Sequence, residues 1–157
     1  MKINRCSVMG KRGFQYNDGT CHIGLSGRHR AEEDAAASGQ AFVSFELDRT
    51  LIDEQGNATG LVKAVQKYHD KGFQIAITTA RDSNDMKAVD KILDDIGIAS
   101  IVKQIHMTSQ KAKGLYFRDS GFSPVLHIDD KAVDIAGLPD SVRGIHASQL
   151  ERPSDSD

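Results

Sequence analysis

Three polar residues, Glu46, Asp48 and Thr50, are spaced two apart directly after the mostly apolar run Phe42–Phe45. The run predicts a buried strand, and because side chains alternate along a strand, Glu46 and Asp48 leave it on the same face. Two carboxylates and a hydroxyl at the carboxyl end of a parallel strand could hold a divalent cation and a phosphate. The spacing therefore favours metal-assisted phosphate chemistry, provided that later strands supply further polar groups.

Later segments supply polar side chains of suitable type. They are Thr79 and Arg81 after one predicted strand, Lys111 or alternatively Lys113 at the start of a helix, and Asp129, Asp130 and Asp134 after another strand. Because the carboxyl ends of parallel strands meet at one edge of a sheet, groups distant in sequence can converge there. Carboxylates suit Mg²⁺, and a hydroxyl and an ammonium beside them would bind phosphoryl oxygens. The sequence thus predicts a site for magnesium and phosphate.

Apolar patterns place these groups at the ends of strands that alternate with helices. Strands are predicted at 42–45, 73–77, 104–107, 125–128 and 143–147, and helices near 61–71, 83–96 and 110–118. Gly72 and Gly97 are typical of helix C-termini. This alternation is typical of an α/β fold with a mainly parallel sheet. We expect one such domain at 41–150, followed by a polar acidic tail at 151–157.

Residues 1–40 form a basic extension with a different pattern. Alternating apolar positions around an Asn-Asp-Gly turn predict a β-hairpin within 14–25, and residues 31–38 are helix-prone. Residues 1–30 carry a net charge of +5, whereas the remainder of the chain carries −7. We expect this arm to dock on the acidic body or to be solvated, with nucleic-acid binding as the alternative.

The composition is that of an ordinary folded domain, with 39% hydrophobic and 27% charged residues. No apolar run is long enough for a membrane span, and no apolar segment typical of a signal peptide follows Lys2 and Arg5. The two cysteines, Cys6 and Cys21, fit a reducing compartment better than a disulfide scaffold. We therefore expect a cytoplasmic protein that makes no use of a membrane.

Four segments, in order, resemble the motifs of the haloacid dehalogenase-like (HAD) superfamily of phosphotransferases. The first, Val43–Thr50, matches an apolar strand followed by Asp-x-Asp-x-Thr, with Glu46 in place of the first Asp. The others are Ile75–Arg81, Lys111, and Leu126–Asp134 with its acidic pair and further Asp. The resemblance covers residues 41–147 and implies a three-layer, Rossmann-like (HAD-like) parallel sheet, to which residues 1–40 add a β-rich extension.

The resemblance also implies roles for these residues in a Mg²⁺-dependent phosphohydrolase that acts on a phosphomonoester. Glu46 would be the nucleophile, and Asp48 would be the general acid and base. The metal ligands would be drawn from Glu46, Asp48, Asp129, Asp130 and Asp134, with Asp134 also orienting Lys111 or a metal-bound water. The substrate would be bound by Thr50, Thr79, Arg81 and Lys111.

Two residues depart from the family's pattern. Glu46 is longer than Asp by one methylene, which moves the attacking oxygen by about 1 Å, and a misplacement of that size can cost about 10²-fold in rate. Arg49 stands where the family often has a small residue such as Gly. We therefore expect a phosphatase of reduced activity. The alternative is a catalytically inactive HAD-like protein that acts by binding a metal, a partner or nucleic acid.

The intervals between the motifs leave no room for the family's bulky cap domains, so the resemblance implies an open site. In the family, open sites go with macromolecular substrates or with oligomers that supply a lid. We thus expect a phosphorylated substrate, small or macromolecular, and a homo-oligomer as a candidate assembly. Among the remaining polar residues, we expect Thr78 to be structural, His106 and His127 to be core histidines, and Lys113 to be solvated.

Overall fold

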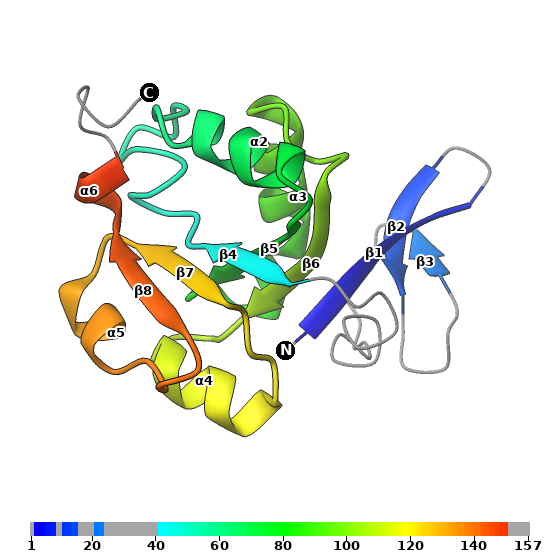
Figure 1. Ribbon diagram of the computed structural model, residues 1–157. Helices are drawn as coiled ribbons and strands as arrows, with labels where there is room; N and C mark the ends of the chain where they lie inside the picture. The colour runs from blue at the N-terminus through cyan, green and yellow to red at the C-terminus, as the bar shows by residue number, and fades with distance from the viewer. Residues whose placement is uncertain (1, 9–10, 16–20, 24–40, 151–157) are drawn as a thin grey trace.

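The computed structural model describes residues 2–8, 11–15, 21–23 and 41–150, with side chains in the last range. In this part of the chain, eight strands form one sheet in the order β3-β2-β1-β6-β5-β4-β7-β8 (Figure 1). The strands are β1 (Lys2–Val8), β2 (Lys11–Gln15), β3 (Cys21–Ile23), β4 (Phe42–Phe45), β5 (Gln74–Thr79), β6 (Val102–Met107), β7 (Leu126–Asp129) and β8 (Arg143–His146). The helices are α2 (Val62–Asp70), η1 (Ser83–Asp85), α3 (Met86–Asp95), α4 (Lys113–Ser120), α5 (Ala132–Ala136) and α6 (Ala147–Leu150).

Five neighbouring strands, in the order β6-β5-β4-β7-β8, run parallel to one another, so β4 lies in the middle of them. Ser44 of β4 lies opposite Ala76 of β5 and His127 of β7, so the carboxyl ends of these three strands lie close together. The α/β fold with a mainly parallel sheet is therefore confirmed. The five strands predicted from the apolar pattern correspond to β4–β8, with ends that agree within two residues.

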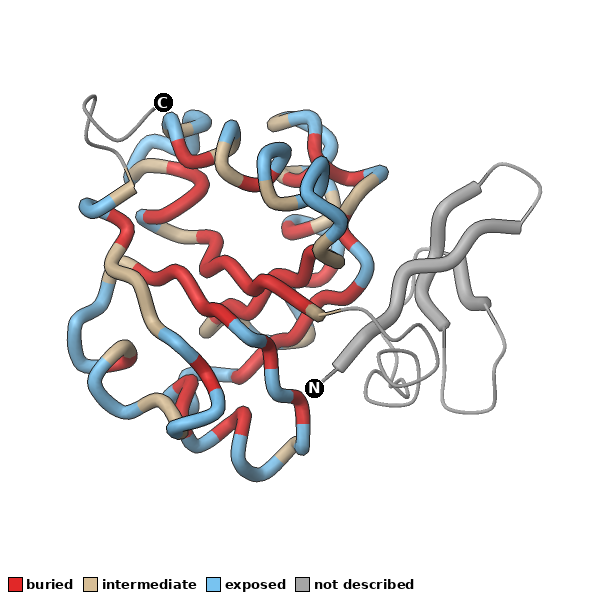
Figure 2. The backbone as a smooth tube through the Cα atoms, in the orientation of Figure 1, coloured by how far each residue is buried: buried red, intermediate tan, exposed pale blue. Residues whose placement is uncertain are grey.

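Helices cover both faces of the parallel sheet, which makes three layers (Figure 1). On one face, Phe45 packs in a cluster with Val65 of α2 and Leu93 of α3. On the other face, Phe42 packs with Phe117 of α4. Strands β4 and β7 are buried along their whole length and β5 along all but its first residue, as Figure 2 shows. None of the helices among the described residues is long and apolar enough to cross a membrane.

The face of the sheet under α4 contains a chain of buried polar side chains. The Thr78 and Ser44 hydroxyls lie 2.6 Å apart, and the Ser44 hydroxyl lies 3.0 Å from Nδ1 of His127. On the other side of its ring, Nε2 of His127 lies 2.9 Å from Oδ2 of Asp129. Buried polar groups are tolerated where each has a partner. His127 is thus a satisfied core histidine, and Thr78 is part of the same structural chain, as expected.

His106 occupies a second, separate polar position on the same face of the sheet. Its Nδ1 lies 2.8 Å from the Tyr116 hydroxyl and its Nε2 lies 2.9 Å from Oε1 of Gln104. Its ring stacks on Phe122 with centroids 4.0 Å apart. The expectation that His106 is a core histidine is confirmed.

The N-terminal strands extend the sheet beyond β6. β1 pairs antiparallel with β6, β2 with β1, and β3 with β2. The predicted hairpin is therefore present as β2 and β3, although its turn and the helix expected at 31–38 lie outside the described residues, as does the acidic tail. β1 was not predicted, because the sequence of Lys2–Val8 lacks a regular alternation of apolar and polar residues.

Helix α4 begins at Lys113, three residues later than predicted. Ser109 and Gln110 have left-handed backbone conformations (φ 52° and 71°), and Ala112 is extended in ψ at 140°. A right-handed helix cannot run through left-handed residues. Lys111 therefore precedes the helix, whereas Lys113 lies in its first turn.

Gly114 allows α4 and α5 to approach closely. A Cβ atom at this position would overlap the carbonyl group of Gly137, at the end of α5. Because Lys113 is the neighbour of Gly114 and Asp134 lies in α5, the same approach brings these two charged side chains together.

We expect Gly114→Ala to lower the free energy of unfolding by about 2–3 kcal/mol, since overpacking against rigid backbone usually costs 1–3 kcal/mol. Gly60→Ala is the matched control, because a Cβ at Gly60 has no neighbour within 4 Å. Urea denaturation followed by circular dichroism would measure both variants. Equal effects of the two substitutions would contradict the close approach of the helices.

Candidate active site

Glu46 follows β4 directly and is buried at the carboxyl edge of the sheet. Its backbone N–H donates to the Ile128 carbonyl (2.9 Å), which continues the ladder with β7 for one more residue. Its Oε1 accepts from the backbone N–H of Leu47 at 2.6 Å. The chain then turns, because the Leu47 carbonyl accepts from the N–H groups of Leu51 and Ile52. The turn leaves Asp48 half-buried at the surface of the site.

The ammonium of Lys113 lies at the centre of the buried part of the site. Its Nζ is 2.7 Å from Oε2 of Glu46, 3.3 Å from Oδ2 of Asp129 and 3.4 Å from Oδ2 of Asp134. The side chain is only 1% exposed. Burial alone would lower the pKa of Lys113, but the three carboxylates, Glu46 first, raise it above its usual range. Lys113 is therefore a buried, permanently charged link between three acidic side chains.

Of the two candidate lysines, Lys113 and not Lys111 contacts the acidic residues of the site. Lys111 is 44% exposed and pairs with Asp119 of α4, and it is not among the residues that line the pocket described below. The expectation that Lys113 is solvated was wrong, because the late start of α4 turns Lys113 toward the sheet. Asp134 accordingly holds Lys113, through both its ammonium and its backbone N–H, and not Lys111.

Asp48 forms a two-pronged ion pair with Arg81, which follows β5. Nε of Arg81 donates to Oδ2 of Asp48 at 2.9 Å, and its Nη2 donates to Oδ1 at 2.8 Å. The hydrogen bonds from Arg81 outweigh the effect of partial burial and lower the pKa of Asp48. In this arrangement Asp48 is ionised at neutral pH. It can accept a proton as a base, but it must part from Arg81 before it can serve as an acid.

The acidic pair after β7 divides between the interior and the pocket. Asp129 is fully buried and accepts from His127 and from the backbone N–H of Lys131 (3.0 Å). Burial alone would raise the pKa of Asp129, but the hydrogen bond from His127 and the charge of Lys113 lower it. Asp130 is half-buried, and its pKa is raised by burial and by the charge of Asp129. Asp130 is thus the member of the pair that faces solvent.

Ser44, His127 and Asp129 have the residue types of a serine-protease triad, but they cannot act as one. All three side chains are 0% exposed, so no substrate can reach the Ser44 hydroxyl. Because an ionised carboxylate only accepts hydrogen bonds, Nε2 of His127 donates to Asp129. The histidine therefore orients Asp129, which in turn faces Lys113.

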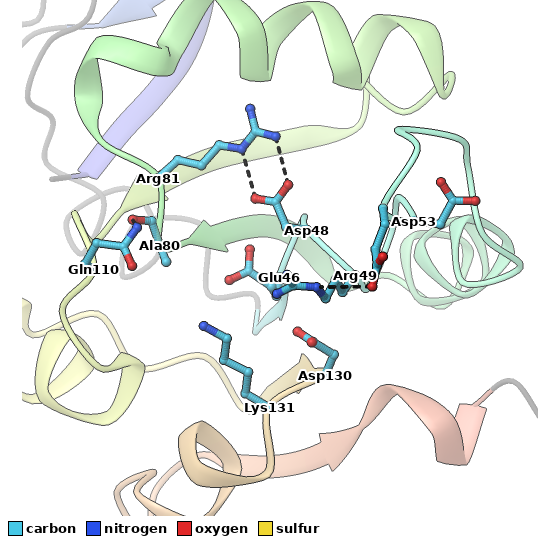
Figure 3. Close-up of a pocket in the computed structure, with 10 residues that line it drawn as sticks. Glu46, Asp48, Arg49, Asp53, Ala80, Arg81, Gln110, Asp130 and Lys131 are labelled. Atoms are coloured by element: carbon cyan, nitrogen blue, oxygen red, sulfur yellow. Dashed lines mark hydrogen bonds and ion pairs between the residues drawn. The ribbon is translucent and has the colours of Figure 1, made fainter.

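A cavity of about 450 Å³ opens where the loops after β4, β5 and β7 meet (Figure 3). It is lined by five acidic residues, three basic residues and two others: Glu46, Asp48, Asp53, Glu54, Asp130, Arg49, Arg81, Lys131, Ala80 and Gln110. Four of the predicted site residues are therefore brought together here: Glu46, Asp48, Arg81 and Asp130. Asp129 and Asp134 are linked to this group through Lys113 and do not line the cavity.

The two predicted threonine ligands are buried beside the cavity and do not line it. The Thr79 hydroxyl accepts from the backbone N–H of Arg81 at 3.4 Å and so helps to shape the loop after β5. The Thr50 hydroxyl is buried and has no hydrogen-bond partner among the described residues. The substrate-binding roles predicted for Thr50 and Thr79 stay predictions.

Arg49, the residue at which the chain departs from the family's pattern with a cation that could bind phosphate or block the site, has a left-handed backbone with φ of 58°. This conformation is disfavoured for residues with a Cβ atom and is adopted readily by glycine. Its side chain is 60% exposed and lies 3.9 Å from Oε1 of Glu54. A glycine would adopt this backbone conformation without strain. The arginine at this position adopts it at some cost in strain.

Of the predicted metal ligands, Glu46, Asp48 and Asp130 line the cavity. Asp48 is held by Arg81, which leaves Glu46 and Asp130 as the lining carboxylates that could hold a divalent cation. Oxygen ligands are those that Mg²⁺ prefers, and it commonly uses one or two carboxylates together with waters and substrate phosphate. The lining carries a formal charge of −2, which a divalent cation would offset. Among the described residues, no group of three or more acidic, histidine or cysteine side chains is arranged around a metal position. The two carboxylates are oxygen donors of the kind that Mg²⁺ uses, and most ligands of a bound ion would have to come from water and phosphate.

No family model, curated protein or solved structure matches the chain. The functional interpretation consequently depends on the positions of its own residues. Of these, the contact between the buried Lys113 and Glu46, at the floor of a cavity that Asp48 and Asp130 also line, is the most specific.

We expect Lys113→Met to lower the free energy of unfolding by about 3–5 kcal/mol, because it leaves three buried carboxylates without their cation. Lys111→Met is the matched control, and it should leave the melting temperature nearly unchanged since exposed ion pairs contribute little. Thermal and urea denaturation would measure both. A small effect at Lys113, equal to that at Lys111, would show that the buried ion pairs are not formed.

We expect Arg49→Gly to raise the free energy of unfolding by about 0.5–1 kcal/mol, since glycine relieves the left-handed strain but loses more backbone entropy on folding. Arg49→Ala removes the same charge and keeps the Cβ atom, so it should have stability near that of the unmodified chain. Urea denaturation compares the three proteins. If alanine stabilises as much as glycine, the gain comes from the lost charge and not from the backbone.

Proposed function

We propose that this chain is a Mg²⁺-dependent, HAD-like phosphohydrolase that removes the phosphoryl group from a phosphomonoester. The proposal rests on one observation above all. The lysine of the segment before β7, Lys113, contacts the carboxylate that follows β4, Glu46, at an edge of the sheet where Asp48 and Asp130 also lie. The motifs that resemble those of the HAD superfamily are thereby joined in space, with Lys113 in place of Lys111.

In the proposed reaction, an oxygen of Glu46 attacks phosphorus in line with the leaving group. The new O–P bond forms as the bond from phosphorus to the leaving oxygen breaks, and Asp48 gives its proton to that oxygen. Asp48 then takes a proton from water, which attacks the glutamyl-phosphate, releases phosphate and restores Glu46. A bound Mg²⁺ would offset negative charge on the phosphoryl oxygens. Glu46 and Asp130 would hold it.

The pairing of Arg81 with Asp48 bears on the first step. Asp48 cannot donate a proton while two hydrogen bonds from Arg81 keep it ionised. A phosphate entering the cavity offers Arg81 a stronger partner, because guanidinium groups bind phosphate with the same two-pronged geometry. Transfer of Arg81 from Asp48 to the substrate would free Asp48 to take up a proton.

The geometry of Glu46 supports the expectation of reduced activity. One of its oxygens is turned back to the N–H of Leu47, and the other is held by Lys113. An aspartate at this position would be shorter and would place its oxygens differently relative to the phosphoryl group. The rate of an in-line displacement falls steeply with errors of about 1 Å.

The second candidate function is binding without turnover. It is favoured by the fact that both carboxylates of the first motif are paired with cations of the chain itself, Glu46 with Lys113 and Asp48 with Arg81. A protein of this kind would keep the site for a phosphorylated ligand or a partner. Contacts of nucleic acid with the basic arm involve side chains outside the described residues and stay a prediction, as does a homo-oligomer.

Hydrolysis of p-nitrophenyl phosphate tests the two candidates. We expect the unmodified chain to show slow, Mg²⁺-dependent turnover above that of Asp48→Asn, and Glu46→Asp to be faster by up to about 10²-fold. Chelation of the metal with EDTA should abolish both activities.

Two other results would change the assignment. If only Glu46→Asp turns over, the site is intact and the natural chain acts by binding. If no variant exceeds Asp48→Asn, the phosphohydrolase proposal fails.

A further inference from the structure

The cavity has a buried floor and an exposed rim that differ in their charges. Glu46, at the floor, is buried, and the reacting phosphoryl group must come close to it. Arg49 and Lys131 also line the cavity, but both residues are exposed. They therefore meet the part of a substrate that extends toward solvent, and Figure 3 shows them on the separate loops that follow β4 and β7.

The cations at the rim are available to bind a ligand, whereas those deeper in the site are already paired with carboxylates. Lys113 is held by three carboxylates, and Arg81 is held by Asp48 through two hydrogen bonds. The ammonium of Lys131 makes no ion pair with any residue that the structure describes, and Arg49 has one distant, exposed partner in Glu54 at 3.9 Å. Exposed pairs of this kind contribute little and are easily exchanged for a better partner.

The backbone conformation of Arg49 also lowers the stability of the fold. Its backbone is left-handed, a conformation in which an L-residue is strained. Strained residues of this kind cluster at functional sites, where their side chains are needed. The placement of a cation at this position, over the cavity and beside Asp48, thus points to a ligand of opposite charge.

We propose that the substrate of this site carries a second phosphate on the side of its leaving group, which Arg49 and Lys131 bind at the rim. The inference rests on the proposed phosphohydrolase and narrows its substrate to bisphosphorylated molecules. A cavity of about 450 Å³ is larger than a single phosphoryl group requires and falls within the range of sites for drug-sized ligands. Both nucleoside and sugar bisphosphates share the required chemistry.

Glu54 opposes this recognition in the unliganded chain. Its carboxylate lines the same cavity, pairs with Arg49 and would repel a second phosphate. Removal of its charge should therefore strengthen the binding of a bisphosphate, whereas removal of the charge of Arg49 or Lys131 should weaken it. Opposite effects of neighbouring substitutions would be difficult to obtain from a general loss of structure.

The test compares dissociation constants of matched ligands by titration calorimetry in EDTA, under which a Mg²⁺-dependent site does not turn over. The ligands are adenosine 3′,5′-bisphosphate against adenosine 5′-monophosphate, and fructose 1,6-bisphosphate against fructose 6-phosphate. We expect at least one bisphosphate to bind about tenfold more tightly than its monophosphate, and the ratio to shrink in high salt. A preference shown in one pair only would identify the scaffold as nucleoside or sugar.

The variants assign the preference to the rim. In Arg49→Gly and in Lys131→Gln the ratio of the two affinities should fall by about three- to tenfold, and in Glu54→Gln it should rise. Arg49→Lys keeps the cation and should retain most of the ratio. Lys87→Ala is the control, because it removes one exposed lysine of α3 that does not line the cavity.

Equal affinities for the bisphosphate and the monophosphate in the unmodified chain would overturn the inference, and so would a preference that Arg49→Gly and Lys131→Gln leave intact. Values of kcat/KM measured in Mg²⁺ on the same ligands separate this failure from failure of the proposed function. Hydrolysis of both ligands with equal kcat/KM would overturn the inference of a second phosphate and leave the proposed phosphohydrolase standing. Selective binding without any hydrolysis sinks the phosphohydrolase and leaves the recognition of a second phosphate standing.

Discussion

The buried ammonium of Lys113 is the interaction on which the site depends. It joins the segment after β4, the end of β7 and helix α5, since Glu46, Asp129 and Asp134 all lie within 3.4 Å of its Nζ. Charges removed from water in this way are stable only as a set, because the loss of one member leaves the others uncompensated. The position of the ammonium depends in turn on the close packing of α4 and α5 at Gly114. The geometry of the candidate site and the packing of the helices are thus two results of one arrangement.

The chain of buried polar side chains on the face under α4 connects the ion pairs of Lys113 to three strands of the sheet. Thr78 of β5, Ser44 of β4 and His127 of β7 form a line that ends at Asp129. Fully satisfied networks of this kind fix one arrangement, because each group that breaks away is left unpaired in a low-dielectric interior. Asp129 is held from behind by His127 while it faces Lys113. Groups at the floor of the cavity are consequently supported by rigid strands, whereas the rim residues Arg49 and Lys131 belong to loops.

The sequence allowed the parallel sheet and the general place of the site to be predicted, since strand ends are marked by changes from apolar to acidic residues. The sequence did not show which of Lys111 and Lys113 lies in the site, because this depends on where α4 begins. The start of α4 is set by left-handed conformations at Ser109 and Gln110, and no glycine in the sequence predicts them. The pairing of Asp48 with Arg81 joins residues 33 positions apart and becomes visible only once β4 and β5 lie side by side. The sequence did contain a signal for the strain at Arg49. This residue lies between Asp48 and Thr50, at a position where the family it resembles often has glycine, and a larger residue at such a position is a candidate for a strained backbone.

The N-terminal strands give the sheet a different boundary from the one its parallel strands alone would have. β6 would otherwise be an outer strand with apolar residues such as Val102 and Ile105 and an unpaired row of backbone donors and acceptors. Strands of this kind invite pairing with other chains. β1 pairs with residues 104–106 of β6, and the sheet ends on this side at β3, which is only three residues long. Addition of β1–β3 thus moves β6 from the edge to the interior of the sheet and leaves a short strand at this edge, which should reduce edge-to-edge pairing with other chains.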